Sequence, residues 1–363
     1  MKTANRLLYL DWMRGLAAVI MLQGHVFHSF LRNDLRTGGP YVFSQFVGGM
    51  PPAIFLFLTG VTLSFLMDSQ GRKGLSWAQR WYGSAKRAGF LFAVAFAFRI
   101  QLWLFTRLFS ETNSPWQEML KVDILNCMGL GIALLAVMAV FTTGERIRYC
   151  AIVGGVIALL SPLVTQFGPL IPLPLLRDYF VPNPAYFSFF PWAAFIAFGM
   201  SFGSLIRIVK DEHLSRGMQW IALGGIALAF GVSALSIFQP ALYSKVDFWV
   251  DGPALILIKL GVLMLMVAFS FVWLLQPSAQ QWSWVRQLGT TSLLVYWVHI
   301  ELVYGHWLGW MKLNLDVGQT VLAAVTITAA MVGLSRLRTT WPQWKPDLGV
   351  LVPQPEPQRV SGD

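Results

Sequence analysis

The sequence is poor in charged residues: Asp, Glu, Lys and Arg make up only 12% of its 363 residues, whereas 56% are hydrophobic. A soluble domain carries about 25% charged residues. The scarcity of charge therefore excludes an ordinary soluble globular protein and indicates a polytopic membrane protein. Acidic residues are scarcer than basic ones, 17 against 27, which gives a formal net charge of +10. Basic cytoplasmic loops of a membrane protein account for such an excess, so we expect no nucleic-acid partner.

Cysteine is nearly absent as well. Cys127 and Cys150 provide no disulfide framework and no spacing of metal ligands, and both lie in or beside apolar segments, where they are expected to pack. His25 and His28 form a pair that is too small to hold a metal ion alone. The sequence therefore predicts no metal site.

Long apolar runs, in contrast, recur along the whole chain. They predict an all-α bundle of about ten transmembrane helices, because each run has the length that a bilayer requires. We expect residues 1–340 to form one transmembrane domain and the Pro-rich residues 341–363 to form a disordered cytoplasmic tail. The expected spans lie near residues 9–31, 50–67, 87–107, 122–141, 149–166, 185–206, 218–238, 254–275, 288–310 and 318–336.

Basic residues gather in alternate loops, most densely between the second and third spans, where the sequence has Arg72, Lys73, Arg80, Lys86 and Arg87. This asymmetry predicts that both termini are cytoplasmic. We expect the bacterial cytoplasmic membrane as the location. The opposite side carries the Pro-rich loop 167–184, which we expect to be extended and stiff. It is either a connector or, as the functional alternative, a lid or a rim that binds the acceptor.

The first span carries a polar stripe. Arg14 and His25 are eleven residues apart, about three helical turns, so they share one face at a separation of roughly 16 Å. Asp11 lies one turn before Arg14, and His28 one turn after His25. Ionisable groups are costly in a membrane and normally face a bundle interior or a cavity. We therefore interpret the stripe as the floor of an active site.

Each residue of the stripe has a functional and a structural interpretation. His25 is neutral near pH 7 yet accepts protons, which suits a general base or an acyl carrier; a buried histidine that bonds a neighbouring helix is the alternative. Arg14 either anchors the helix at the membrane surface or holds the phosphates of a cytosolic cofactor, with Asp11 orienting it. His28 is either a partner of His25 or an ordinary interface residue.

Two further polar residues interrupt the third and fourth spans. Arg99 either pairs with Asp11 or another buried carboxylate, or contacts a ligand. Asn126 either bridges two helices or contacts a ligand.

The ninth span holds a second polar cluster. Ser292, Tyr296 and His299 lie at i, i+4 and i+7 on one helix face, whereas Glu301 points elsewhere. The face formed by the first three residues either completes a site with the first helix or forms a hydrogen-bonded packing seam.

The segment Arg14-Gly-Leu-Ala-Ala-Val-Ile-Met-Leu-Gln-Gly-His25 resembles the arginine, ten-residue, histidine pattern of the transmembrane acyltransferase superfamily. That superfamily includes the acyltransferase-3 proteins and the relatives of heparan-α-glucosaminide N-acetyltransferase. The resemblance extends to residues 52–60, 122–130, 190–192 and 288–299, and so covers nearly the whole chain.

The resemblance implies transfer of an acyl group, usually acetyl from cytosolic acetyl-CoA, to a carbohydrate acceptor beyond the membrane. It implies that Arg14 lies on the CoA side and that His25 is the general base or acyl carrier. Tyr296 or Ser292 would donate a hydrogen bond to the oxyanion. Acceptance at oxygen or nitrogen stays open, as does the oligomeric state, with a homo-oligomer among the alternatives.

Two other functions compete with this one. A transporter or flippase would use Arg14, His25 and His299 as a polar path, but the sequence shows no pair of inverted repeats, which many secondary transporters have. A non-catalytic membrane subunit would retain the fold without the chemistry.

Overall fold

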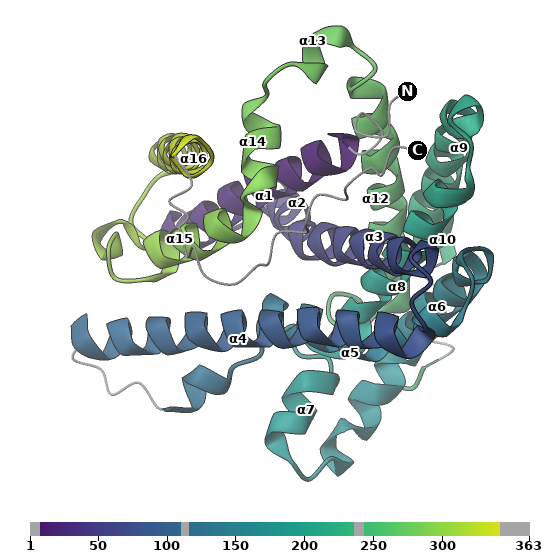
Figure 1. Ribbon diagram of the computed structural model, residues 1–363. Helices are drawn as coiled ribbons and strands as arrows, with labels where there is room; N and C mark the ends of the chain where they lie inside the picture. Colours follow the sequence, from purple (N-terminus) through teal and green to yellow (C-terminus); the bar gives the residue numbers. More distant parts are fainter. Residues whose placement is uncertain (1–7, 110–115, 236–242, 342–363) are drawn as a thin grey trace, which may run out of the picture.

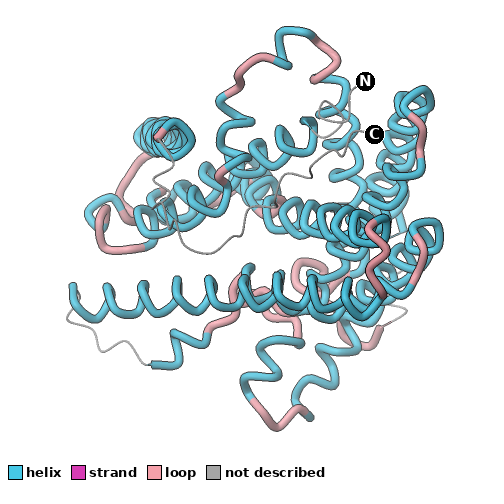
Figure 2. Tube along the Cα trace, viewed as in Figure 1, coloured by secondary structure: helices cyan, strands magenta, loops and turns pink. Residues whose placement is uncertain are grey.

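The computed structural model describes residues 8–109, 116–235 and 243–341. Within these ranges every extended regular element is a helix and no β-strand occurs, as Figure 2 shows. A single isolated bridge joins Leu31 and Leu315. The predicted all-α fold is therefore confirmed, and the proposed tail 341–363 lies outside the described residues apart from Trp341.

The helices follow the apolar runs of the sequence, and several begin at a side chain that caps them. Asp123, Thr142 and Asp316 each accept a hydrogen bond from the backbone three residues later, and the residue there bonds back to the capping residue's backbone, as in a capping box. The helices are α1 (Leu8–Phe30), α2 (Gly39–Gly48), α3 (Pro51–Arg72), α4 (Trp77–Phe109), α5 (Ile124–Leu135), α6 (Thr143–Phe167), α7 (Pro174–Phe180), α8 (Phe189–Ile208), α9 (Asp211–Ile226), α10 (Val232–Leu235), α12 (Pro253–Trp273), α13 (Pro277–Gln280), α14 (Trp284–Thr290), α15 (Ser292–Tyr304) and α16 (Val317–Thr340).

Seven helical stretches of the described chain are long and apolar enough to cross a membrane: Gly39–Arg72, Trp77–Leu108, Thr143–Leu170, Phe189–Ile208, Asp211–Ala234, Pro253–Trp273 and Val317–Thr340. Each overlaps a predicted span, so the chain is a multi-pass membrane protein. Helix α1, 23 residues long and interrupted by the polar stripe, is not among them. The stretches Ile124–Val140 and Ser292–Tyr304 are shorter apolar helices. The count of ten spans and the cytoplasmic termini therefore remain predictions.

The structure differs from the expected ninth span, which is two helices. Helix α14 ends at Thr290 and α15 begins at Ser292, and Thr291 between them leaves the helical conformation. The hydroxyl of Thr291 lies 2.6 Å from that of Ser335 on α16, and the side-chain amide of Gln287 donates to the same hydroxyl at 3.0 Å. These bonds compensate for the break, since irregular backbone at membrane depth is tolerated where protein covers it.

The Pro-rich loop 167–184 also differs from its prediction as an extended segment. Its central residues form the short helix α7. Pro174 occupies the first helical position, where its missing N–H costs no hydrogen bond, and Pro182 comes after the helix ends. The extended prediction was therefore wrong for α7 because these prolines flank a helix.

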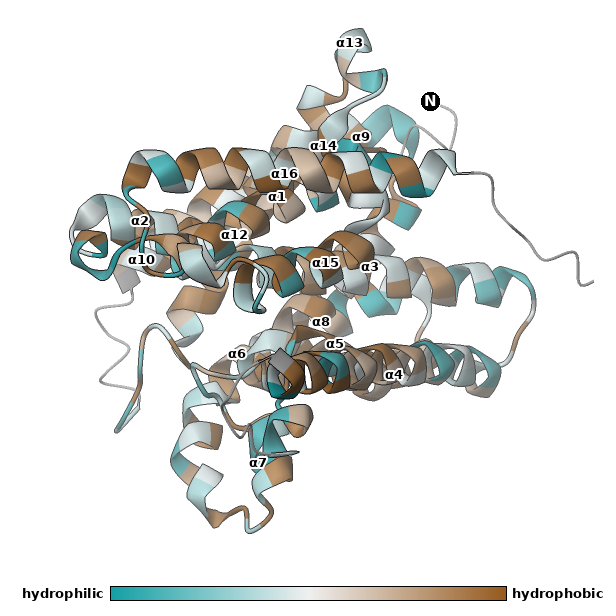
Figure 3. Cartoon of the chain, turned by 90° about the vertical axis from the view of Figure 1, so that its left-hand side faces the viewer, coloured by the Kyte–Doolittle hydropathy of each residue, from teal (hydrophilic) through white to brown (hydrophobic). Residues whose placement is uncertain are grey.

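Helix α1 lies between two apolar cores. Met13 and Ala17 in its first half join the larger core, which is built mainly around α3, α8 and α12. Leu22 and Phe30 in its second half join a smaller core with α15 and α16. Figure 1 shows α1 between these groups, with the long helix α4 below it. The outer faces of α4 and α16 are largely apolar (Figure 3), as expected for contact with lipid.

Glycines allow the central helices α3 and α8 to touch backbone to backbone. A Cβ atom placed on Gly60 would lie 2.0 Å from the carbonyl oxygen of Ile196, and one on Gly199 would lie 1.9 Å from that of Phe57. Small residues at such crossings are typical of membrane helices because they permit close packing.

Replacing Gly60 by alanine is therefore expected to force α3 and α8 apart and to destabilise the protein by about 1–3 kcal/mol. Thermal unfolding of the detergent-purified protein measures the effect. Gly155→Ala on α6 is the matched control, because a Cβ atom there meets nothing within 4 Å. Equal midpoints for Gly60→Ala and wild type would contradict the contact.

Candidate active site

The polar stripe of α1 faces a cavity of about 990 Å³ enclosed mainly by α1, α3, α4 and α15. Arg14, His25 and His28 all line it. Asp11 does not line it, but its carboxylate accepts a hydrogen bond from Arg14 Nη1 at 2.9 Å. Three of the four stripe residues therefore line one cavity, and the fourth, Asp11, bonds Arg14.

Helix α14 fixes the start of the stripe. A Cβ atom on Gly15, the residue after Arg14, would lie 1.8 Å from the carbonyl oxygen of Val285. One on Gly289 would lie 2.2 Å from that of Asp11. These two glycines bring the backbones of α1 and α14 into contact, and so fix the position from which Arg14 extends into the cavity.

A second arginine joins Arg14 at this end of the cavity. Arg87 on α4 also lines it, and its positive charge repels that of Arg14. No acidic side chain of the described chain forms an ion pair with Arg87. The sequence analysis did not single out this residue because an arginine at the start of a span is usually an ordinary loop charge. Two guanidinium groups of which one lacks a carboxylate partner suit an anionic ligand.

At the other end of the stripe, two histidines from opposite ends of the sequence meet. His25 Nδ1 lies 2.9 Å from His299 Nε2, and the planes of the two rings are nearly parallel, with an interplanar angle of 13°. His299 is 0% exposed and does not line the cavity; its Nδ1 lies 2.7 Å from the carbonyl oxygen of Val295. The polar face of α15 thus meets α1, and His299 lies behind His25 and not on the cavity wall.

Tyrosines surround the histidine pair. The ring edge of Tyr304 packs against His25 at 5.3 Å between centroids, and its hydroxyl lies 3.2 Å from His28 Nδ1. Tyr296 packs edge-on against His299 at 5.9 Å. The sequence analysis missed Tyr304, although extending the four-residue spacing from Tyr296 through Ile300 reaches it.

The remaining two hydroxyl candidates, Ser292 and Tyr296, both lie on α15. Ser292 and Tyr296 both line the cavity, and neither hydroxyl has a hydrogen-bond partner within the part of the chain that the structure describes. Both are thus able to donate a hydrogen bond to a molecule in the cavity.

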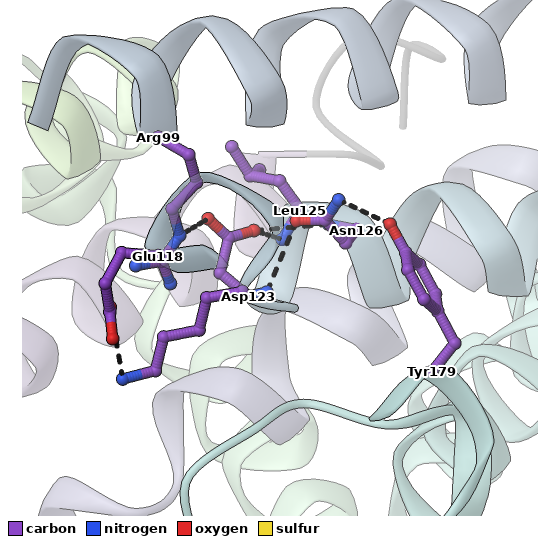
Figure 4. A network of polar contacts seen from close by, with 7 residues as sticks. Arg99, Glu118, Asp123, Leu125, Asn126 and Tyr179 are labelled. Carbon is purple, nitrogen blue, oxygen red and sulfur yellow. Dashed lines mark hydrogen bonds and ion pairs between the residues drawn. The ribbon is translucent and has the colours of Figure 1, made fainter. Parts of the chain in front are cut away.

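A buried ion pair joins α4 to the start of α5 (Figure 4). Arg99 Nε donates to Asp123 Oδ2 at 3.2 Å, and Oδ1 of the same carboxylate accepts from the backbone N–H groups of Leu125 and Asn126. Both Arg99 and Asp123 line the cavity. Of the partners considered for Arg99, Asp11 was wrong, because Asp11 binds Arg14 one turn away on its own helix.

Asn126 bridges helices and does not line the cavity. Its amide donates to the Tyr179 hydroxyl at 2.9 Å, which ties α5 to α7 (Figure 4). Burial raises the pKa of Tyr179, so its hydroxyl stays protonated at neutral pH. Glu301 points away from the histidine pair, as expected, and accepts from Gln101 of α4 at 3.2 Å.

The structure thus places a cavity with arginines at one end and a histidine pair at the other inside a bundle of apolar helices. A cavity with this lining is able to hold an anionic ligand inside the membrane. Among the described residues, no group of three or more His, Cys, Asp or Glu side chains is placed to hold a metal ion. The prediction that no metal takes part stays a prediction.

Residues 6–240 match the family described as heparan-alpha-glucosaminide N-acetyltransferase, catalytic. The match covers more than half of the chain, so the protein belongs to this family, and it is a membrane acetyltransferase in the broad sense. The matched region contains Arg14, His25 and Arg99, and it ends before α15, which carries His299. No curated protein matches the chain.

Proposed function

We propose that the protein transfers an acetyl group from cytosolic acetyl-CoA to the amino group of a carbohydrate at the extracytoplasmic side of a bacterial cytoplasmic membrane. The observation that carries this proposal is the cavity along α1, with Arg14 at one end and His25 toward the other. Family membership supports acetyl transfer in general and favours nitrogen over oxygen as the acceptor atom.

The arginine end suits the donor. Arg14 and Arg87 offer the charged, planar N–H groups that bind phosphate oxygens well, and the expected orientation of α1 turns them toward the cytosol. The flexible arm of CoA would then follow the stripe for about 16 Å and bring the thioester close to His25.

The histidine end suits the chemistry. His25 would accept a proton from the amine as its nitrogen attacks the thioester carbonyl. The new C–N bond forms, the C–S bond breaks, and the departing thiolate takes the proton back from His25. Tyr296 or Ser292 would donate a hydrogen bond to the oxyanion formed between these steps. In the alternative route, His25 itself carries the acetyl group before the acceptor takes it.

The acceptor would enter from the opposite side. His28 and Arg99 line the cavity and are proposed to contact the carbohydrate. Asn126 would act indirectly, since its bond to Tyr179 holds α7 beside the start of α5. The interior of the bundle limits access of water, which would protect the thioester from hydrolysis.

Acetyl-CoA binding and turnover by the purified protein, with an α-linked glucosaminide as acceptor, test the proposal. Replacing Arg14 and Arg87 together by glutamine is expected to raise KM for acetyl-CoA by about 10²–10⁴-fold with a smaller change in kcat, because each of the two charge-assisted bonds to phosphate is worth about 1.5–3 kcal/mol and both contribute to binding. Arg148→Gln, at an exposed position on α6, is the matched control.

A folded wild-type protein that binds no acyl-CoA would contradict the proposal. Movement of a substrate across vesicle membranes without any requirement for acyl-CoA would favour the transporter instead. An unchanged KM for acetyl-CoA in the double variant would show that the two arginines do not bind the donor. The proposed reaction itself would not be contradicted by that result.

A further inference from the structure

We infer that His299 is a positioning residue that holds the His25 ring and determines which of its nitrogens is free to accept a proton. This inference rests on the proposed function, in which His25 is the base. It assigns His299 a role that acts through His25, where the sequence left open whether its helix face completes a site or forms a packing seam.

The hydrogen positions follow from the backbone. The Val295 carbonyl only accepts, so His299 Nδ1, 2.7 Å away, carries the hydrogen and donates it. A neutral imidazole has one N–H group, which leaves His299 Nε2 with a lone pair. His25 Nδ1, 2.9 Å from that lone pair, must then donate. His25 Nε2 is consequently unprotonated, and it belongs to the ring that lines the cavity.

The orientation of His299 does not depend on the ring it holds. Val295 lies four residues before His299, so their bond forms within α15 alone. Helix α15 is in turn fixed against α1: Ser29 donates to the Val303 carbonyl at 2.8 Å, and Val26 packs in the same core as Val295. The position of His25 is thus set by a second helix before any substrate arrives.

The same geometry accommodates the charged state. When Nε2 takes a proton, Nδ1–H of His25 continues to donate to His299, so neither ring has to turn during the reaction. No carboxylate of the described residues bonds either ring. A neutral partner suits this place, because a buried carboxylate at membrane depth would cost more than an imidazole.

Two variants separate positioning from other roles. His299→Phe keeps a planar ring but removes the acceptor, and is expected to lower kcat by about 10²-fold while leaving KM for acetyl-CoA nearly unchanged. His299→Gln retains an amide oxygen that accepts from His25 Nδ1, and is expected to restore kcat to within about tenfold of wild type, since one hydrogen bond is preserved. The assay follows release of free CoA with an α-linked glucosaminide, alongside thermal stability of each variant.

The outcomes are distinct. Recovery by glutamine and not by phenylalanine, at similar stability, supports positioning. If glutamine is as inactive as phenylalanine, or if phenylalanine retains full activity, the inference is overturned; a large rise in KM would overturn it in favour of substrate contact. Absence of turnover in the wild type would instead reject the proposed function itself. His213→Gln, on the exposed part of α9, is the control and should match wild type.

Discussion

His25→Ala is expected to lower acetyl transfer by about 10²–10⁴-fold, the contribution that a well-placed general base makes. Acetyl-CoA should still bind, because the arginines at the other end of the cavity are unchanged. Turnover with an α-linked glucosaminide and equilibrium binding of acetyl-CoA, measured on the same preparation, separate the two effects.

The exposed histidine at position 213 provides the control, since His213→Ala removes an imidazole far along the chain on α9. Full activity of the His25 variant would reject His25 as base and as acyl carrier alike. Loss of acetyl-CoA binding together with turnover would instead assign His25 to the donor site.

Asp123→Ala is expected to destabilise the protein by about 3–5 kcal/mol, the cost of leaving a charge buried without its partner. The substitution leaves Arg99 unpaired and removes the N-cap of α5, because the same carboxylate serves both. Thermal and denaturant unfolding of the purified protein in detergent measure the loss.

Two comparisons test whether the ion pair is responsible. Removing both partners, as Arg99→Met with Asp123→Ala, should be less destabilising than Asp123→Ala alone, because no buried charge is then left unpaired. Asp34→Ala breaks an exposed pair with Arg32 and should change stability little. If Asp123→Ala matches the Asp34 variant, the buried pair does not stabilise the fold.

The apolar runs predicted where the helices lie but not where they break. Residues 288–310 read as one span because their hydropathy continues across Thr291, while the break depends on bonds to Ser335 of α16, far along the chain. The prolines of 167–184 are compatible with an extended loop and equally with a short helix between them. Only the structure shows that Pro174 begins α7 and that Pro182 follows it.

The candidate site likewise has a part that spacing within one helix predicts and a part that depends on contacts between distant segments. Helical spacing alone placed Arg14 and His25 on one face, and that part of the site was predictable. The partner of Arg99 was not, because Asp123 and Asp11 are both acidic and only the folded chain shows that Asp11 already binds Arg14. Likewise, the spacing within α15 identified the helix face that carries His299. It did not show that the His25 ring lies between His299 and the cavity.

Because a single helix carries both Arg14 and His25, their separation along the axis is constant at about 16 Å. Helix α14 contacts this helix at Gly15, and α15 contacts it through Ser29, so both ends are fixed. Under the proposed function, α1 would therefore set the length of donor that reaches from the arginines to His25. A truncated thioester such as acetylated cysteamine would reach His25 but would be too short to contact the arginines, and it would gain no affinity from them.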